Sequence, residues 1–107
     1  MIYADNAATT RISESVLEKM LPFLREQYGN ASSRYSLGVK AKRAIEQARK
    51  QVATALSAEP SEIAFTSGGS ETNSWVLRSV IKSHSNEPIH IITSSIEHHS
   101  VLNACLS

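Results

Sequence analysis

The stretch FTSGGSE, residues 65–71, joins a short apolar run to a segment of helical periodicity through two adjacent glycines. The apolar run, residues 63–65, is bounded by turn residues, which is typical of a buried β-strand. The following helix is expected from Ser70 to about Lys82, because apolar residues recur there at helical spacing. The stretch therefore predicts a strand-to-helix turn of an α/β fold.

The turn at Gly68, Gly69 and Ser70 is a candidate anion site. The N–H groups in the first turn of a helix have no partner inside the helix and lie at the positive end of its dipole, so a phosphate can satisfy them. Glycine lets a ligand approach the backbone closely. The stretch lacks the lysine of a nucleoside-triphosphate P-loop and the spaced glycines of a dinucleotide fingerprint, so nucleotide binding is the weaker alternative. The pattern alone supports phosphate binding and a plain structural turn equally.

A histidine pair, His98 and His99, follows a second expected strand at residues 89–93, which is rich in β-branched residues. Open α/β sheets bind ligands at the carboxyl ends of their strands, so the pair is expected to face the same region as the glycine turn. A histidine there can stack on a flat cofactor and exchange protons with a substrate. Surface histidines without a function are the alternative, and a zinc site would need further ligands that are not evident.

Three more helices are expected. The first follows Ser13, a candidate N-cap, and Pro22 is expected to kink or divide it. The second runs from about Ser36 to Ser57, and a last one opens at residues 101–106. Trp75, in the helix after the glycine turn, is expected to pack rather than to act.

The element order predicts an α/β layer with a parallel sheet and right-handed crossovers. Two short strands are too few for such a sheet, because its strands need neighbours and cover on both faces. We therefore expect residues 1–107 to be part of a larger domain, or to depend on a partner.

Composition excludes several classes of function. The 107 residues carry a formal net charge of +1, which gives no electrostatic basis for binding nucleic acid or an anionic membrane. The basic residues Lys40, Lys42 and Arg43 are expected on the same helix as Glu46, which indicates a solvated face. No stretch reaches the roughly 20 apolar residues of a membrane span, and no secretory signal opens the chain, so a cytoplasmic protein is expected.

The single cysteine, Cys105, cannot form an intrachain disulfide or a multi-cysteine metal site. It is expected to be a small apolar residue of a helix. No metal site is predicted.

Four segments in order resemble the NifS-like cysteine desulfurases, which belong to the class V aminotransferase group of fold-type I enzymes that use pyridoxal 5′-phosphate (PLP). They are YADNAATT at residues 3–10, GNASS at residues 29–33, the glycine stretch at residues 65–71 and the segment IITSSIEH at residues 91–98. Each motif is unspecific by itself, whereas four in order over nearly the whole chain are specific.

The resemblance implies roles for individual residues. It implies that the Gly69 N–H and the Ser70 N–H and hydroxyl hold the cofactor phosphate, and that His98, rather than His99, stacks on the pyridine ring and takes part in catalysis. On the substrate side of the pocket it implies Asn6, Ala7 and Thr9. Asp5 is expected to be structural, with its carboxylate bonded to nearby backbone.

The sequence departs from the family pattern at four positions. Ser70 stands where the family usually has Thr, Ala31 where it has Pro, Tyr35 where it has His, and Ser74 where it has a second Asn. Ser70 keeps the hydroxyl, so phosphate binding is expected to survive.

The resemblance further implies that this chain is the N-terminal part of a fold-type I large domain, with the rest of that domain and a C-terminal small domain absent. The activity implied is conversion of L-cysteine to L-alanine, with the sulfur passed to an enzyme cysteine persulfide for iron–sulfur cluster or thionucleoside synthesis. The lysine that binds the cofactor and the persulfide cysteine lie beyond residue 107 in the family, so the segment alone is expected to be inactive. A homodimer and a sulfur-acceptor protein, such as an iron–sulfur scaffold, are the implied partners.

Two alternatives remain open from the sequence. A selenocysteine lyase or another class V aminotransferase-like enzyme would share the glycine turn and the histidine. A noncatalytic α/β phosphate-binding module would bind phosphate without the cofactor chemistry.

Overall fold

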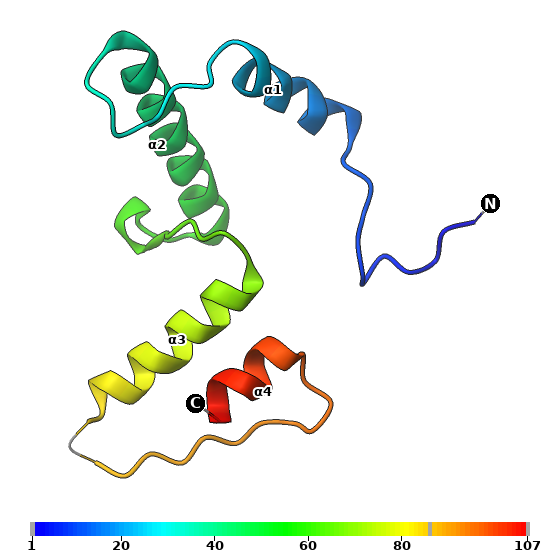
Figure 1. The fold of residues 1–107 in the computed structure, drawn as a ribbon, viewed down its shortest axis with the longest axis vertical. Helices are drawn as coiled ribbons and strands as arrows, with labels where there is room; N and C mark the ends of the chain where they lie inside the picture. Colours follow the sequence, from blue (N-terminus) through cyan, green and yellow to red (C-terminus); the bar gives the residue numbers. More distant parts are fainter. Residues whose placement is uncertain (1, 86, 107) are drawn as a thin grey trace. The chain divides into compact units, whose positions relative to one another are not determined.

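The computed structural model of the chain describes residues 2–85 and 87–106. The regular structure in these residues is helical, as Figure 1 shows. The elements are α1 (Glu14–Arg25), α2 (Ser36–Leu56), the short 3-10 helix η1 (Pro60–Glu62), α3 (Gly69–Ser83) and α4 (His99–Leu106). The chain divides into two compact units, one ending at Ile63 and the other beginning at Ala64.

Helix α1 begins after Ser13, as predicted, but the Ser13 side chain makes no cap hydrogen bond. Its hydroxyl oxygen lies 3.3 Å from that of Ser15 instead. Pro22 lies inside the helix without dividing it, so of the two predicted effects, a kink or a division, the division is wrong. The Pro22 carbonyl still accepts the N–H groups of Glu26 and Gln27, both at 2.9 Å, and α1 ends one turn after the proline. A proline lacks only its own N–H, so it removes one bond to the preceding turn and none made by the residues after it.

Helix α2 begins at Ser36, as predicted, and ends at Leu56, followed by Ser57 in the left-handed conformation at φ 53°. Gly38 is buried near its start. A Cβ at Gly38 would lie 2.5 Å from the carbonyl oxygens of Asn30 and Ser33, so the preceding loop packs directly on the helix backbone. Only glycine permits this contact.

The end of the first unit is held by polar contacts. The Glu59 N–H donates to the Glu62 carboxylate at 2.7 Å, which closes the capping box of η1. The Arg49 guanidinium, from α2, donates to the Ile63 carbonyl. The first bond lies within η1 and its cap, and the second connects the residue after η1 to α2.

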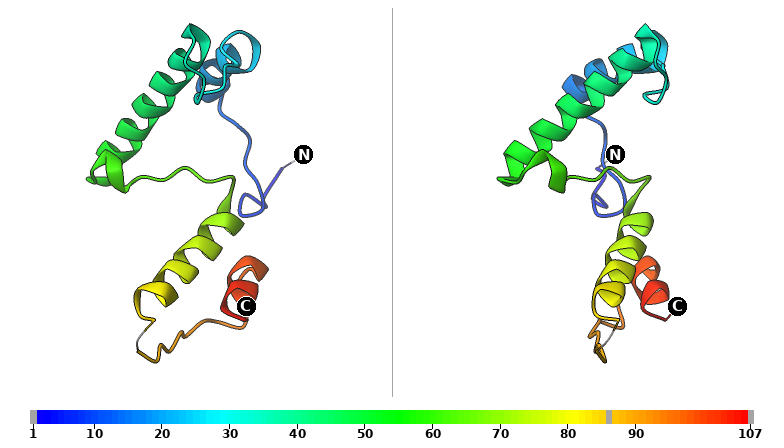
Figure 2. Two further views of the ribbon diagram at one scale, coloured as in Figure 1. Left: turned by 60° about the vertical axis from the view of Figure 1, so that its left-hand side comes forward. Right: turned by 90° about the vertical axis from the view of Figure 1, so that its left-hand side faces the viewer.

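In the second unit, α3 and α4 lie side by side, as both views of Figure 2 show. Asn73 of α3 donates from Nδ2 to the Ser100 hydroxyl of α4 at 2.9 Å. Ala104, on α4, is buried. Helix α3 extends one residue beyond its predicted range at each end, and α4 begins two residues earlier than predicted, at His99.

The two predicted strands are not confirmed. Residues 63–65 and 89–93 carry no regular secondary structure, so the described residues contain no sheet. A strand needs a paired neighbour to satisfy its backbone groups, and the described part of the chain offers neither segment one. An apolar pattern identifies a segment that is suited to a sheet, but the sheet forms only when that segment pairs with a neighbouring strand.

The buried core of the described residues is small. The buried hydrophobic residues are three alanines, Ala41, Ala53 and Ala104. Trp75 is 55% exposed, so the predicted packing of its ring is wrong for this structure. None of the described helices combines the length and the apolar character needed to cross a membrane.

Candidate functional site

The glycine turn is held by the first side chains of α3. Glu71 accepts two hydrogen bonds on one carboxylate oxygen, from the Ser67 N–H at 2.6 Å and from the Ser67 hydroxyl at 2.7 Å. Thr66 and Thr72 join their hydroxyls across the same turn at 2.8 Å. The bonds from Ser67 favour the ionised carboxylate and lower the pKa of Glu71 below its ordinary value, the side-chain bond more than the backbone bond. The turn therefore has a defined shape that does not depend on a ligand.

Backbone donors precede the first hydrogen bond of α3. The Thr72 N–H bonds back to the Gly68 carbonyl at 3.2 Å. The N–H groups of Gly69 and Ser70 come earlier in the chain, where no helical carbonyl can reach them. They therefore form the donor end of the helix dipole, as an anion site requires.

The two glycines of the turn differ from those of the first unit. A Cβ at Gly29 would lie 2.6 Å from the Leu37 carbonyl oxygen, and Gly38 is equally constrained. At Gly68 and Gly69 a Cβ would meet nothing within 4 Å. Gly68 is extended at φ 163°, a conformation open to any residue, so neither packing nor backbone geometry within this chain explains the glycines of the turn.

His98 stands directly before α4, and its carbonyl accepts the Val101 N–H at 2.8 Å. Its Nδ1 lies 2.8 Å from the Ser100 hydroxyl and accepts the Ser100 N–H at 3.1 Å. The imidazole thus occupies the place of a helix-capping side chain. The His99 ring is tilted by 58° to that of His98, with the ring centroids 6.4 Å apart.

Ser70 and His98 line one hollow between α3 and α4. The other lining residues are polar except one: Ser74, Arg78, His99, Ser100, Asn103 and Ala104. Two residues that are 28 positions apart in the sequence, and that were assigned to one site on sequence grounds, are therefore neighbours here. Gly69 adjoins Ser70 at the start of the same helix.

The other predicted site residues, Asn6, Ala7 and Thr9, are exposed and belong to the first unit. A turn forms at this segment, because the Ala8 N–H donates to the Asp5 carbonyl at 3.1 Å. The Tyr3 hydroxyl donates to the same carbonyl at 2.8 Å. In the described residues the hydrogen bonds to Asp5 therefore run through its backbone rather than through the predicted carboxylate. The substrate-side role of this segment stays a prediction.

The GNASS segment has a structural role of its own. The Asn30 side-chain oxygen accepts the Ser32 N–H at 2.8 Å, and the Asn30 carbonyl accepts the Ser33 N–H at 2.9 Å. This Asx turn brings the loop onto Gly38. Tyr35, one of the departures from the family pattern, is 62% exposed.

Asn73 and Ser100 are the site residues that sequence reasoning missed. Asn73 lies one helical turn after Ser70, and Ser100 lies two residues after His98. The second spacing carries a usable signal, since a capping side chain pairs with the N–H two residues on. The bond between Asn73 and Ser100 leaves no signal in the sequence, because it depends on the packing of α3 against α4.

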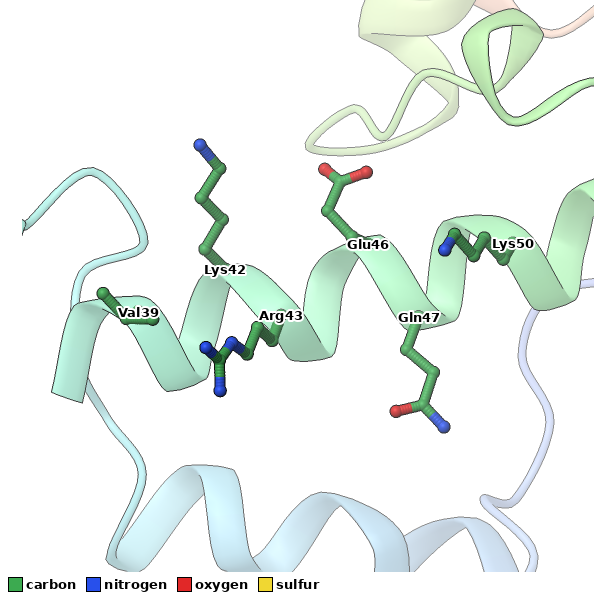
Figure 3. Close-up of a pocket in the computed structure, with 6 residues that line it drawn as sticks. All are labelled: Val39, Lys42, Arg43, Glu46, Gln47 and Lys50. Atoms are coloured by element: carbon green, nitrogen blue, oxygen red, sulfur yellow. The ribbon is translucent and has the colours of Figure 1, made fainter. Parts of the chain in front are cut away.

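The other polar features offer no comparable arrangement. A hollow on α2 is lined by residues of that single helix, as Figure 3 shows: Val39, Lys42, Arg43, Glu46, Gln47 and Lys50. The basic residues predicted to form a solvated face, Lys40, Lys42 and Arg43, are all exposed. No cluster of three or more metal-ligating side chains occurs within residues 2–85 and 87–106. Cys105 is a partly buried free thiol.

Comparison with known proteins matches residues 2–107 to the family aminotransferase class-V. The chain is 49% identical to "Cysteine desulfurase IscS" of Methanosarcina thermophila, over 97% of this chain and 26% of that protein. It is 46% identical to "Cysteine desulfurase 2" of Trichormus variabilis, over 98% of this chain and 26% of that protein. A solved structure titled "NIFS-LIKE PROTEIN" is similar at a TM-score of 0.85 and 43% identity, over 95% of this chain and 28% of the other. The chain thus spans about a quarter of the length of these relatives, and it belongs to the aminotransferase class-V family.

Proposed function

We propose that this chain supplies the cofactor-phosphate loop and the ring-stacking histidine of a PLP-dependent cysteine desulfurase. The named relatives at 43–49% identity support this reaction class. The proposed reaction converts L-cysteine to L-alanine and leaves the sulfur as a persulfide on an enzyme cysteine. Neither that cysteine nor the cofactor lysine is assigned to this chain.

The observation that carries the proposal is the unfilled space over Gly68 and Gly69 beside the hollow that Ser70 and His98 share. Packing does not require glycine at Gly68 or Gly69, and the N–H groups of Gly69 and Ser70 precede the first hydrogen bond of α3. Both features fit an external anion that approaches the backbone. A hydroxyl at Ser70 adds a third donor to this cradle. The residues present therefore fit the phosphate of PLP.

The residues have separate tasks in this proposal. The Gly69 N–H, the Ser70 N–H and the Ser70 hydroxyl bind the phosphate, and Glu71 fixes the turn through Ser67. The His98 ring, held at the start of α4, stacks on the cofactor ring. Bound PLP supplies an electron sink for bond cleavage at the substrate amino acid. The substrate side of the pocket comes from Asn6, Ala7 and Thr9.

The proposal also includes the larger assembly. Residues 63–65 and 89–93 lead into the glycine turn and toward the histidine pair, and neither segment has regular secondary structure here. We propose that they become parallel strands of a fold-type I large domain once neighbouring strands are present, since strand pairing then satisfies their backbone groups. The complete enzyme is proposed to be a cytoplasmic homodimer that passes sulfur to an acceptor protein such as an iron–sulfur scaffold.

The direct test is PLP affinity of the full-length protein after Ser70→Ala. Hydrogen bonds to a charged group contribute about 1.5–3 kcal/mol. The dissociation constant of PLP should therefore rise roughly tenfold to a hundredfold. Ser79→Ala, one hydroxyl removed from an exposed position of the same helix, is the matched control. Unchanged PLP affinity in Ser70→Ala would remove the phosphate role of this turn.

A further inference from the structure

The hydrogen bonds around His98 determine where its ring proton lies. The Asn73 amide nitrogen has only protons to offer, so the Ser100 oxygen accepts at that contact, at 2.9 Å. The Ser100 N–H can only donate, and it donates to His98 Nδ1 at 3.1 Å, so this nitrogen is an acceptor. The Ser100 hydroxyl, 2.8 Å from the same nitrogen, then donates to it while the Ser100 oxygen accepts from Asn73.

His98 Nδ1 therefore receives two donors. A nitrogen that accepts hydrogen bonds from two N–H or O–H groups carries no proton of its own. The proton of the neutral ring must then lie on Nε2. A proton on Nδ1 would reverse the contact with the Ser100 hydroxyl and break the one with the Ser100 N–H, which is the side-chain cap of α4.

We propose that Ser100 and Asn73 are positioning residues that hold His98 as its Nε2–H tautomer, so that the ring offers the hollow a hydrogen-bond donor rather than a base. Asn73 fixes the direction of the Ser100 hydroxyl, Ser100 fixes the tautomer, and both together fix the orientation of the ring. The groups that share the hollow with His98 include the Arg78 guanidinium and the His99 ring. The tautomer is a property of this chain, whereas its use beside a cofactor rests on the proposed function.

The same chain contains a histidine with the opposite arrangement. His84 Nδ1 lies 3.0 Å from the Val80 carbonyl oxygen, which can only accept, so this nitrogen must carry the proton. The Ser83 hydroxyl also lies 3.0 Å from it. A serine beside Nδ1 thus does not by itself decide the tautomer, and His84 is an internal reference for His98.

Nitrogen-15 NMR of the full-length apo protein, labelled at histidine, measures the tautomers directly at a pH where the rings are neutral. The expected spectrum shows His98 Nδ1 with the shift of an unprotonated ring nitrogen and Nε2 with that of a protonated one. His84 should show the reverse assignment. A protonated Nδ1 in His98 of the unmodified protein would overturn the proposal without recourse to any variant.

Variants separate the two positioning residues. Ser100→Ala removes one of the two donors and keeps the backbone N–H, so the ratio of Nε2–H to Nδ1–H should fall by roughly twofold to tenfold. Ser100→Thr keeps the hydroxyl and should restore the ratio. Asn73→Asp places an acceptor where the amide donated, which turns the Ser100 proton away from His98, and should lower the ratio at least as far as Ser100→Ala.

Ser83→Ala is the matched control, because it removes a serine beside His84 and should leave the His98 signals unchanged. An unchanged His98 ratio in both Ser100→Ala and Asn73→Asp would refute the positioning role. An absorbance scan with PLP on the same samples separates this inference from the proposed function. If the tautomer is as predicted but PLP does not bind, the proposed function is wrong and the tautomer inference stands. If PLP binds but the tautomer is the opposite one, the inference is wrong and the proposed function stands.

Discussion

At the scale of single residues, two short side-chain networks hold the site, and in each a side chain accepts a backbone N–H group. Glu71 accepts from Ser67 at the glycine turn, and His98 accepts from Ser100 at the start of α4. Both acceptors lie within four residues of their donors, so these bonds are local, whereas the Asn73–Ser100 bond joins α3 to α4. The site therefore owes its shape to side chains beside the residues that would touch a ligand.

The network at the turn predicts a change in one titration. Ser67→Ala removes the hydroxyl bond, the larger cause of the lowered pKa of Glu71, so this pKa should rise toward its ordinary value of 4.5. Carbon-13 NMR of the Glu71 carboxyl group measures it. Because the folded-state pKa lies below the unfolded value, the bonds stabilise the fold above pH 4.5 and lose their effect as pH falls through the folded-state pKa. No change in the Glu71 titration would show that the bond from the Ser67 hydroxyl does not form.

The histidine pair predicts unequal kinetic effects. If the full-length protein is the proposed enzyme, His98→Ala should lower turnover more than His99→Ala, because His98 is the proposed stacking residue and contacts the Ser100–Asn73 pair. Loss of a general acid–base group typically costs about 10²- to 10⁴-fold in rate. Equal losses, or a larger loss in His99→Ala, would contradict the assignment of His98.

At the scale of elements, the glycines divide into those that packing requires and those that it does not. Gly38 lets the loop at Asn30 and Ser33 lie on the backbone of α2, whereas Gly68 faces open space before α3. Glycines such as Gly38 are required by the packing of the fold. Glycines such as Gly68 leave space that a ligand can occupy.

Gly38→Ala should destabilise the full-length protein by about 1–3 kcal/mol, the usual cost of overpacking, because its Cβ would lie 2.5 Å from two backbone oxygens. Gly68→Ala is the matched control and should leave the free energy of unfolding nearly unchanged, since its Cβ meets nothing within 4 Å. Denaturant unfolding of both variants measures the difference. Equal stability of the two would mean that the loop does not pack on α2 as described.

The elements also show what the sequence can predict and why the rest escapes it. Helices α2 and α3 were predicted within one residue at each end, because a helix satisfies its own backbone and its pattern is local. Residues 63–65 and 89–93 have the pattern of strands but no regular secondary structure here, because strand pairing depends on neighbours that a local pattern does not reveal. Ser70 and His98 line one hollow, although the described residues lack the sheet on which their expected proximity was based. The bond between Asn73 and Ser100 depends on helix packing and could not be predicted.

At the scale of the whole molecule, the described residues leave large apolar side chains uncovered. Ile92 and Ile96 are 88% and 92% exposed, and Trp75 and Val76 are more than half exposed. Globular proteins rarely leave so much apolar surface in water without a partner. We expect the remaining three-quarters of the length seen in the relatives to cover it.

Residues 1–107 expressed by themselves should consequently lack a cooperative unfolding transition and should bind a hydrophobic dye strongly. The full-length protein should do neither. Thermal unfolding with dye fluorescence compares the two. A sharp transition and weak dye binding in the segment alone would show that the exposed apolar surface is tolerated without cover.

Alanine production from L-cysteine by the full-length protein, with PLP and a thiol reductant, tests the proposed activity. We predict L-alanine and sulfide in equal amounts, with both lost or strongly reduced in His98→Ala. Bound PLP without alanine formation from L-cysteine would refute the proposed function.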